Sequence, residues 1–433
     1  MNPVQPDTDC LTKNVRSTIS LWRAWNHVKP RGLRSKNPQT RAETARFAEN
    51  EPRSIRLLQT RLRNPSFTFA QQRGAKKKRG KGKAPRVFVI SSIEDRVILR
   101  SLLNTCQSRS RRLLAALGRI PEYIATPTSV GGIEDRGTHD AVRLITGAIE
   151  AGAKWFIRSD IQDFFPSIPK GRIRELLNET VQDKNFVSLF MTALETDLAN
   201  ANELKEEGLY HLFPVGSTGV PQGSSLSALC GNIILQPFDA MMNGRGITTV
   251  RYLDDFVILG KSKVSVEQAW QAGLKFIESL DMRAHDPQQN SDKASMGEIK
   301  SGFDFLSIHF TDREVYPSAK AHKSLLASIR DTIKESKKTI LAAQHGPRRK
   351  PDCYVQTLAL IDSKIRGWGD AFSPTTLRVK LNQIDTELAK EIDDYRTWFE
   401  RKVQAKQEPE RRRMWGIATL RDSPVPKSRR ATR

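Results

Sequence analysis

The sequence is poor in cysteine and in long hydrophobic runs, and each shortage excludes a class of protein. Its 433 residues include four cysteines, and no two of them form a CxxC pair. Neither a disulfide framework nor a zinc site is therefore expected. No stretch approaches the roughly 20 apolar residues that a membrane-spanning helix needs, and residues 1–10 lack the order of a signal peptide. We expect a cytoplasmic protein without a membrane partner.

Acidic residues are scarce at both ends of the chain. Residues 1–100 hold 23 basic and 7 acidic side chains, residues 401–433 hold 11 and 3, and the whole chain carries a formal net charge of +23. A nearly neutral middle between two basic ends indicates that a polyanion binds at the periphery. Any acidic catalytic centre is then expected in the middle of the chain.

The densest basic run lies between residues 73 and 86, where lysines alternate with glycine and no acid occurs. Such a run is typical of a solvated, flexible loop, but together with the basic C-terminal end it favours contact with nucleic-acid phosphates. The predicted phosphate-binding residues are Arg73, Lys76, Lys77, Lys78, Arg79, Lys81 and Lys83.

The spacing of apolar residues predicts an α+β fold. Hydrophobic residues make up 38% of the chain, enough for a sizeable core. Short helices are expected over the first 70 residues, and three amphipathic helices that can pack as a bundle are expected at 326–333, 355–368 and 377–399. Strands are expected at 87–90, 155–157, 173–177, 250–259 and 303–310.

These patterns divide the chain into four regions. They are a basic helical N-terminal extension (1–75), a mixed domain of helices and strands (76–316), a three-helix domain (317–400) and a basic, disordered tail (401–433).

Aspartates stand beside or within strand-like apolar runs. Asp160 and Asp163 occur in IRSDIQDFFPSI, and Asp254 and Asp255 interrupt RYLDDFVIL. An acid inside a strand is disfavoured, and an adjacent Asp pair is more often a turn, yet the apolar residues here run straight on. A tight β-hairpin with the carboxylates at its tip resolves the conflict if they face a divalent cation. Mg²⁺ is the expected ion, because it prefers hard oxygen ligands.

These motifs resemble reverse transcriptases, most closely the bacterial group II intron-like branch. YLDD at 252–255 resembles the Tyr-x-Asp-Asp motif, and DIQDFF at 160–165 resembles the first palm motif. GVPQGSSLSALCGNIIL at 219–235 resembles the segment beneath the incoming nucleotide. Weaker matches occur in the family's order at 86–97, 136–141 and 365–372. Two positions depart from the pattern: Leu253, where Ala is common, and Ser307, where Gly is usual.

The resemblance implies a right-hand polymerase, with fingers and palm built from an antiparallel sheet plus helices and an α-helical thumb. It implies an RNA-directed DNA polymerase in which Asp160, Asp254 and Asp255 are catalytic and bind two Mg²⁺ ions, with Mn²⁺ as a substitute. Ile161 would add its backbone carbonyl to the metal site. The nucleotide-binding residues implied are Arg86, Asp163, Phe164, Phe165, Gln222, Gly223 and Lys293. Partners would be an RNA template, a DNA or RNA primer, deoxynucleoside triphosphates and a dedicated non-coding RNA.

Two other functions stay open at this point. An RNA-copying RNA polymerase shares the palm, but an aromatic Phe165 under the sugar would exclude a 2′-hydroxyl. A maturase or RNA-binding splicing cofactor could carry a vestigial polymerase, but the aspartates are intact. Since no Cys or His follows residue 372 to form an HNH nuclease, analogy favours a stand-alone bacterial role such as antiviral defence. The sequence does not determine the oligomeric state.

Overall fold

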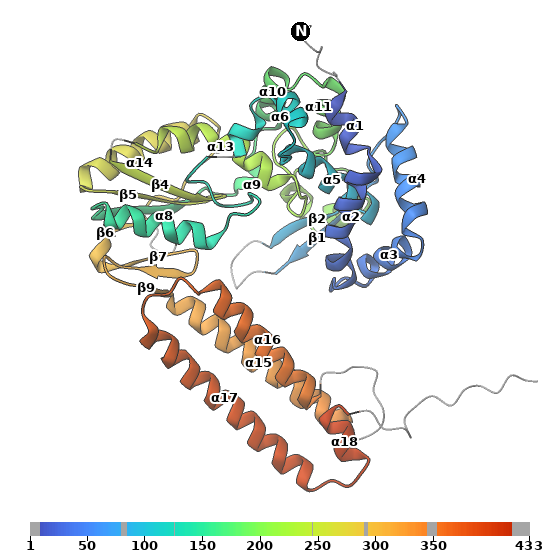
Figure 1. The fold of residues 1–433 in the computed structure, drawn as a ribbon, viewed down its shortest axis with the longest axis vertical. Helices are drawn as coiled ribbons and strands as arrows, with labels where there is room; N and C mark the ends of the chain where they lie inside the picture. The colour runs from blue at the N-terminus through green and yellow to red at the C-terminus, as the bar shows by residue number, and fades with distance from the viewer. Residues whose placement is uncertain are drawn as a thin grey trace, which may run out of the picture. The chain divides into compact units, whose positions relative to one another are not determined.

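The computed structural model describes residues 9–78, 85–124, 126–244, 246–289, 293–343 and 353–417. The chain forms two compact units, Met1–Glu298 and Ile299–Arg433 (Figure 1). Each unit has its own hydrophobic core. None of the described helices is both long and apolar enough to cross a membrane. Three predicted phosphate-binding residues, Arg79, Lys81 and Lys83, lie outside the described residues.

The first unit opens with helices that share its main core. They are α1 (Cys10–Val15), α2 (Thr18–Leu33), α3 (Pro38–Glu49) and α4 (Glu51–Arg63). Trp25 on α2 and Ile55 on α4 are buried in the same cluster as Val97 on α5 (Ile93–Cys106). The predicted helices are therefore confirmed, but they pack into the first unit and do not form a separate extension.

A two-stranded hairpin follows, made of β1 (Arg73–Lys77) and β2 (Arg86–Ile90) in antiparallel pairing. The strand at 87–90 is confirmed, whereas the prediction that the basic run is a loop is wrong for residues 73–77. Gly74 explains the difference. Its N–H donates to Asn200 Oδ1 at 2.9 Å, and a Cβ there would lie only 2.5 Å from Leu204 Cδ1. The hairpin is thus fixed against a small core that includes Val87, Val89 and Phe213.

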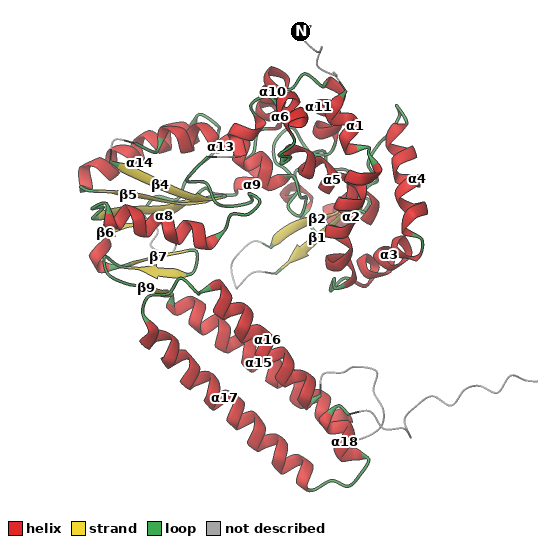
Figure 2. Ribbon diagram, viewed as in Figure 1, coloured by secondary structure: helices red, strands yellow, loops and turns green. Residues whose placement is uncertain are grey.

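The centre of the first unit is a four-stranded antiparallel sheet in the order β4-β5-β3-β6. The strands are β3 (Trp155–Asp160), β4 (Ile247–Tyr252), β5 (Asp255–Gly260) and β6 (Ser295–Glu298). Figures 1 and 2 show α8 (Thr138–Glu150) on one side of the sheet and α14 (Lys263–Glu278) on the other. Alternate residues of β5 serve the two faces, and Phe256 stacks on Trp270 of α14.

The remaining segments of the first unit are mostly helical. They include α6 (Arg111–Leu117), α7 (Ile120–Ile124), α9 (Phe164–Ser167), α10 (Lys170–Thr180), α11 (Lys184–Thr192), α12 (Ala201–Glu206), a 3₁₀ turn (Tyr210–Leu212) and α13 (Ser227–Met241). The predicted strand at 173–177 is wrong, because these residues belong to α10. Ile173 and Leu177 are four residues apart and both fully buried, which places them on one face of a helix.

The second unit combines a small sheet with long helices. After a 3₁₀ turn (Ile299–Ser301), its elements are β7 (Phe303–Phe305), β8 (Ile308–Phe310), β9 (Val315–Pro317), α15 (Ala319–Ala343), α16 (Tyr354–Ala371), α17 (Arg378–Gln404) and α18 (Glu410–Trp415). The three predicted helices are confirmed, and the predicted strand region 303–310 contains β7 and β8.

Both predicted boundaries of the three-helix domain differ from the structure. The unit begins at Ile299 and not at 317, so it includes the three-stranded sheet. The prediction of disorder from residue 401 is wrong for 401–417, since α17 continues to Gln404 and Met414 of α18 is fully buried. Tyr354 holds this end together, with its ring 3.9 Å from Phe399 and 5.4 Å from Trp415. Residues 418–433 lie outside the described residues.

Candidate active site

The sheet brings the three predicted catalytic aspartates together. Asp160 ends β3 and is paired in register with Asp255, which begins β5. Asp254 lies in the two-residue turn between β4 and β5, and its carbonyl accepts a hydrogen bond from Ile161 N at 3.1 Å. The predicted hairpin with carboxylates at its tip is therefore confirmed. Antiparallel pairing explains how residues so distant in sequence meet at one edge of the sheet.

Burial and mutual repulsion act on these carboxylates. Burial, followed by the nearby charges of Asp254 and Asp160, raises the pKa of Asp255 to about 6. Burial also raises the pKa of Asp254, with the charge of Asp160 adding to the effect. Desolvated carboxylates in close proximity resist ionisation unless a cation compensates them. The site therefore favours the binding of positive charge.

Asp160 shows where such a charge can bind. The residue is 7% exposed, and its carboxylate forms an ion pair with Lys293 through Oδ2. Its other oxygen, Oδ1, is buried and accepts no hydrogen bond among the described residues, with His285 Nε2 3.6 Å away. A buried carboxylate oxygen without a hydrogen-bond partner costs free energy of folding, and such an atom is suited to bind a cation.

The donor set at this edge fits Mg²⁺. It offers carboxylate and backbone oxygens, the ligands that Mg²⁺ prefers, and no soft donor. Among the described residues, no group of three or more His, Cys, Asp or Glu side chains forms a ready metal cage. The carbonyl of Ile161 as a ligand stays a prediction.

Three of the predicted nucleotide-binding residues lie together. Arg86 Nε donates to Gln222 Oε1 at 2.9 Å, and Val89 N donates to the Gln222 carbonyl at 2.9 Å. Gly223 has φ +112°, and a Cβ there would lie 2.9 Å from the carbonyl oxygen of Val89. Only glycine fits this close approach without strain. The segment that follows Val220 is thus fixed to the β1–β2 hairpin.

The residues after Asp160 form a tight turn into α9. Asp163 has φ +42°, and its carbonyl accepts hydrogen bonds from both the N–H and the hydroxyl of Ser167. Phe164 is buried against Gly231, where a Cβ would lie 2.7 Å from the ring. Phe165 is only half-buried, with its ring 5.3 Å from that of Phe164. Phe164 therefore serves the core, whereas Phe165 keeps an accessible face.

The described basic residues of the hairpin are exposed. Arg73, Lys77 and Lys78 are exposed to solvent, and Lys76 forms an exposed ion pair with Glu207 at 2.8 Å. Exposed ion pairs of this kind contribute little to stability, so Lys76 remains able to exchange Glu207 for a phosphate.

A basic cleft was missed by sequence reasoning. It is a cavity of about 630 Å³ between α2, α5 and the segments around Gly132 and Gly223. Its cations are Arg31, Arg96 and Arg100, its acid is Glu134, and His27 also lines it. Arg100 Nε and Ser225 Oγ are buried there without hydrogen-bond partners among the described residues. Burial lowers the pKa of His27 to about 4, and the charges of Arg100 and Arg31 act in the same direction.

Unpaired donors and repelling cations at one cleft indicate an anionic ligand. The signal for this cleft in the sequence is the general excess of arginine in the first 100 residues. The cleft arginines lie on two separate helices, α2 and α5, and the spacing of residues along the sequence does not show that these helices meet.

The raised pKa of Asp255 predicts an unusual stability profile for the metal-free protein. A carboxyl whose pKa rises on folding favours the folded state while it is protonated, and this contribution is lost as pH rises from about 4 through about 6. Asp255→Asn should therefore stabilise the metal-free protein at pH 7.5 by about 1–3 kcal/mol and have little effect at pH 4. Urea unfolding of both proteins in a chelator checks this. Equal destabilisation at both pH values would contradict it.

Comparison with known proteins agrees with this geometry. The family model described as reverse transcriptase (RNA-dependent DNA polymerase) matches residues 77–310, more than half of the chain. Protein YkfC of Escherichia coli K12 is 24% identical over 260 residues, which cover 51% of this chain and 62% of YkfC. Retron Mx65 reverse transcriptase of Myxococcus xanthus is 26% identical over 173 residues, which cover 39% of this chain and 38% of the relative.

A putative COX1/OXI3 intron 2 protein of Saccharomyces cerevisiae is 31% identical over 91 residues, covering 21% of this chain and 10% of the relative. The chain spans less than two thirds of the length of these relatives. A solved telomerase from Candida albicans aligns with 80% of this chain and 61% of its own, at 12% identity and a TM-score of 0.41, too low to assign a fold.

The relatives named for introns and a retron confirm the resemblance to the group II intron-like branch. The family match confirms the right-hand polymerase fold. That the four-stranded sheet is the palm, that the β1–β2 hairpin belongs to the fingers and that the helices of the second unit are the thumb stay predictions. The chain belongs to the reverse transcriptase family.

Proposed function

We propose that this protein is an RNA-directed DNA polymerase whose reaction takes place at Asp160, Asp254 and Asp255. One observation carries the proposal: the β3–β5 register gathers these carboxylates at a buried edge, where burial and mutual charge raise the pKa of Asp254 and Asp255. Such a site requires cations, and nucleotidyl transfer supplies them together with the triphosphate.

Asp160, Asp254 and Asp255, with the Ile161 carbonyl, would hold two Mg²⁺ ions, or Mn²⁺ in their place. When bound, the metals would lower the pKa of the primer 3′-hydroxyl and neutralise charge on the leaving pyrophosphate. Lys293 forms an ion pair with Asp160, and its ammonium would give the leaving pyrophosphate a proton once a metal ion had replaced it on the carboxylate.

The residues of the fingers would bind the substrate. Arg86, held by Gln222, would contact the triphosphate, and the half-buried Phe165 would pack under the sugar of a deoxynucleotide. Backbone amides at Asp163 and Phe164 would add donors to phosphate oxygens. In that position the ring would leave no room for a 2′-hydroxyl, which would make DNA the product.

The basic surfaces would bind RNA. Arg31, Arg96 and Arg100 in the cleft would contact template phosphates, since Arg100 and Ser225 offer buried donors without partners among the described residues. The lysines of β1 would contact phosphates further along the RNA. A dedicated non-coding RNA as template, and a stand-alone bacterial role such as antiviral defence, belong to the proposal by analogy alone.

Asp254→Asn should abolish Mg²⁺-dependent deoxynucleotide incorporation, because the site loses a charged ligand at the tip of the hairpin. The rate should fall by at least about 1,000-fold, equal to about 4 kcal/mol of transition-state stabilisation. RNA affinity should stay within a few-fold of wild type. The matched control is Asp312→Asn, an exposed carboxylate in the second unit, which should leave the rate unchanged. Primer extension by Asp254→Asn at near the wild-type rate would contradict the proposal.

Changing Lys76, Lys77 and Lys78 together to alanine should weaken RNA binding equally for all sequences, because these side chains contact phosphates and not bases. Each lost contact should reduce the slope of log affinity against log salt by roughly 0.7–0.9. The control is the pair Lys261→Ala and Lys263→Ala, exposed lysines beyond the end of β5 that is opposite Asp255. An unchanged slope in the triple variant would show that the hairpin does not bind RNA.

Phe165→Val should admit ribonucleotides selectively, with a modest loss of deoxynucleotide use. If Phe165 were only a core residue, truncation would instead reduce the use of every nucleotide alike. It would also lower the free energy of unfolding, by up to about 3–5 kcal/mol for a change to alanine. The measurement is the ratio of kcat/KM for a deoxynucleotide and its ribonucleotide partner, with thermal unfolding recorded alongside. An unchanged ratio would reopen the alternative of an RNA-copying RNA polymerase.

A further inference from the structure

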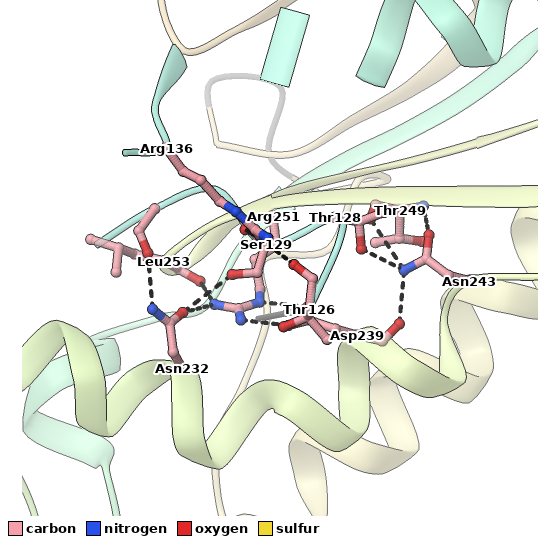
Figure 3. Close-up of polar contacts among 11 residues, drawn as sticks. Thr126, Thr128, Ser129, Arg136, Asn232, Asp239, Asn243, Thr249, Arg251 and Leu253 are labelled. Carbon is pink, nitrogen blue, oxygen red and sulfur yellow. Dashed lines mark hydrogen bonds and ion pairs between the residues drawn. The ribbon is translucent and has the colours of Figure 1, made fainter. Parts of the chain in front are cut away.

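A buried arginine contacts the two-residue turn Leu253–Asp254, which we call the catalytic turn. Arg251 on β4 is 0% exposed, although arginine is almost never fully buried without partners. Its Nε donates to Asp239 Oδ1 at 2.7 Å and its Nη2 to Asp239 Oδ2 at 2.6 Å, so α13 and β4 are joined by a two-pronged ion pair (Figure 3).

The third nitrogen of the same guanidinium reaches the turn itself. Arg251 Nη1 donates to the carbonyl of Leu253 at 2.9 Å and to Asn232 Oδ1 at 3.1 Å. Leu253 precedes Asp254 and has φ +59°, in the left-handed region that residues with a branched side chain rarely adopt. A charged donor on its carbonyl stabilises that conformation relative to alternatives that would turn the carbonyl away.

The segment 126–131 completes the support. Val130 N donates to the Arg251 carbonyl at 2.9 Å, and Arg251 N donates to Thr128 O at 3.0 Å, so this segment forms an isolated parallel bridge beside β4. Asn232 Nδ2 donates to the Gly131 carbonyl at 3.0 Å. A Cβ at Gly131 would lie 2.6 Å from Leu253 N, so the segment packs directly against the turn.

The outer side of this segment is also fixed. Arg136 donates to the carbonyls of Thr126 and Ser129, and the hydroxyl of Thr126 donates to Asp239 Oδ2 at 3.3 Å. The hydrogen bonds drawn in Figure 3 thus link α13, β4 and the 126–131 segment around one carbonyl of the catalytic turn.

We propose that Arg251 is a positioning residue for the polymerase reaction: it holds the left-handed Leu253 so that Asp254 and Asp255 present their carboxylates to the metal ions. This inference rests on the proposed function of those aspartates. A buried ion pair alone is weak evidence for a stabilising role, because apolar residues can often replace it without loss. The contact that apolar residues cannot replace is the one to Leu253.

Arg251→Lys tests the role while keeping the buried positive charge beside Asp239. A single ammonium cannot bind both Asp239 oxygens and still reach Leu253 as the planar guanidinium does. We expect kcat to fall about 100-fold with RNA affinity within a few-fold of wild type. Binding of Mn²⁺ to the nucleotide-free protein, followed by electron paramagnetic resonance, should weaken about tenfold.

A second variant keeps the test valid if the lysine variant does not fold. The pair Arg251→Met with Asp239→Leu removes both buried charges and leaves neither unpaired, so folding should survive. It also removes the contact to Leu253, and the same losses in kcat and Mn²⁺ affinity are expected. Full activity and Mn²⁺ affinity in this pair would overturn the proposal.

Coupling to the turn distinguishes positioning from general stabilisation. Asparagine adopts the left-handed conformation more readily than leucine, so Leu253→Asn should make the turn less dependent on Arg251. The loss of Mn²⁺ affinity caused by Arg251→Lys should be at least about fivefold smaller in the Leu253→Asn background than in the wild-type background. An equal loss in both backgrounds, or a loss that follows the melting temperature alone, would contradict the proposal.

The outcomes separate this inference from the proposed function. If the wild-type protein binds Mn²⁺ but incorporates no nucleotide, the polymerase assignment fails while the coupling between Arg251 and the turn is still measured. If incorporation occurs and Arg251→Lys leaves both kcat and Mn²⁺ affinity unchanged, only the positioning role fails.

Discussion

The crowding of three carboxylates at one buried edge is the constraint on which the rest of the first unit depends. Asp160 and Asp255 are neighbours through strand pairing, so the backbone fixes a repulsion that the side chains cannot relieve by moving apart. Burial raises the pKa of Asp254 and Asp255 in addition. A fold maintains such a site only if its other contacts over-determine the geometry.

The surrounding elements supply that over-determination. The two faces of the four-stranded sheet are covered by α8 and α14, which buries the strand residues next to the aspartates. Lys293 neutralises Asp160 from the loop before β6, while the Arg251 network fixes the turn from below. Positive charge is thus present close to the carboxylates, and it comes from a half-exposed lysine that a metal ion can displace.

The parts of the fold that sequence reasoning predicted share a cause. The aspartates could be recognised because charged residues broke apolar runs in IRSDIQDFFPSI and RYLDDFVIL, and the hairpin at 254 followed from that conflict. The long helices of the second unit could be predicted because their apolar stripes repeat over several turns. Patterns of this kind lie within one short segment, so the sequence of that segment is enough to predict its structure.

The parts that were missed depend on contacts between distant segments. Residues 73–77 have a loop-like composition, but Asn200 and Leu204 hold them as a strand. Residues 173–177 were too short a run to separate a strand from one face of a helix. Arg251 follows the same rule as Asp254, a charge within an apolar strand, and the rule would have found it. Its partner Asp239 could not be identified without the fold.

The central claim, that Asp160, Asp254 and Asp255 form a divalent-metal site for nucleotidyl transfer, is tested most directly by a crystal structure. Crystals of the protein with primer, template and a non-hydrolysable deoxynucleoside triphosphate would be grown in Mn²⁺, and anomalous scattering would locate the metal. The account predicts Mn²⁺ between the triphosphate and the carboxylates of Asp160 and the 254–255 turn, with Lys293 displaced from Asp160. Mn²⁺ bound elsewhere, with the Lys293–Asp160 ion pair intact beside a bound nucleotide, would contradict it.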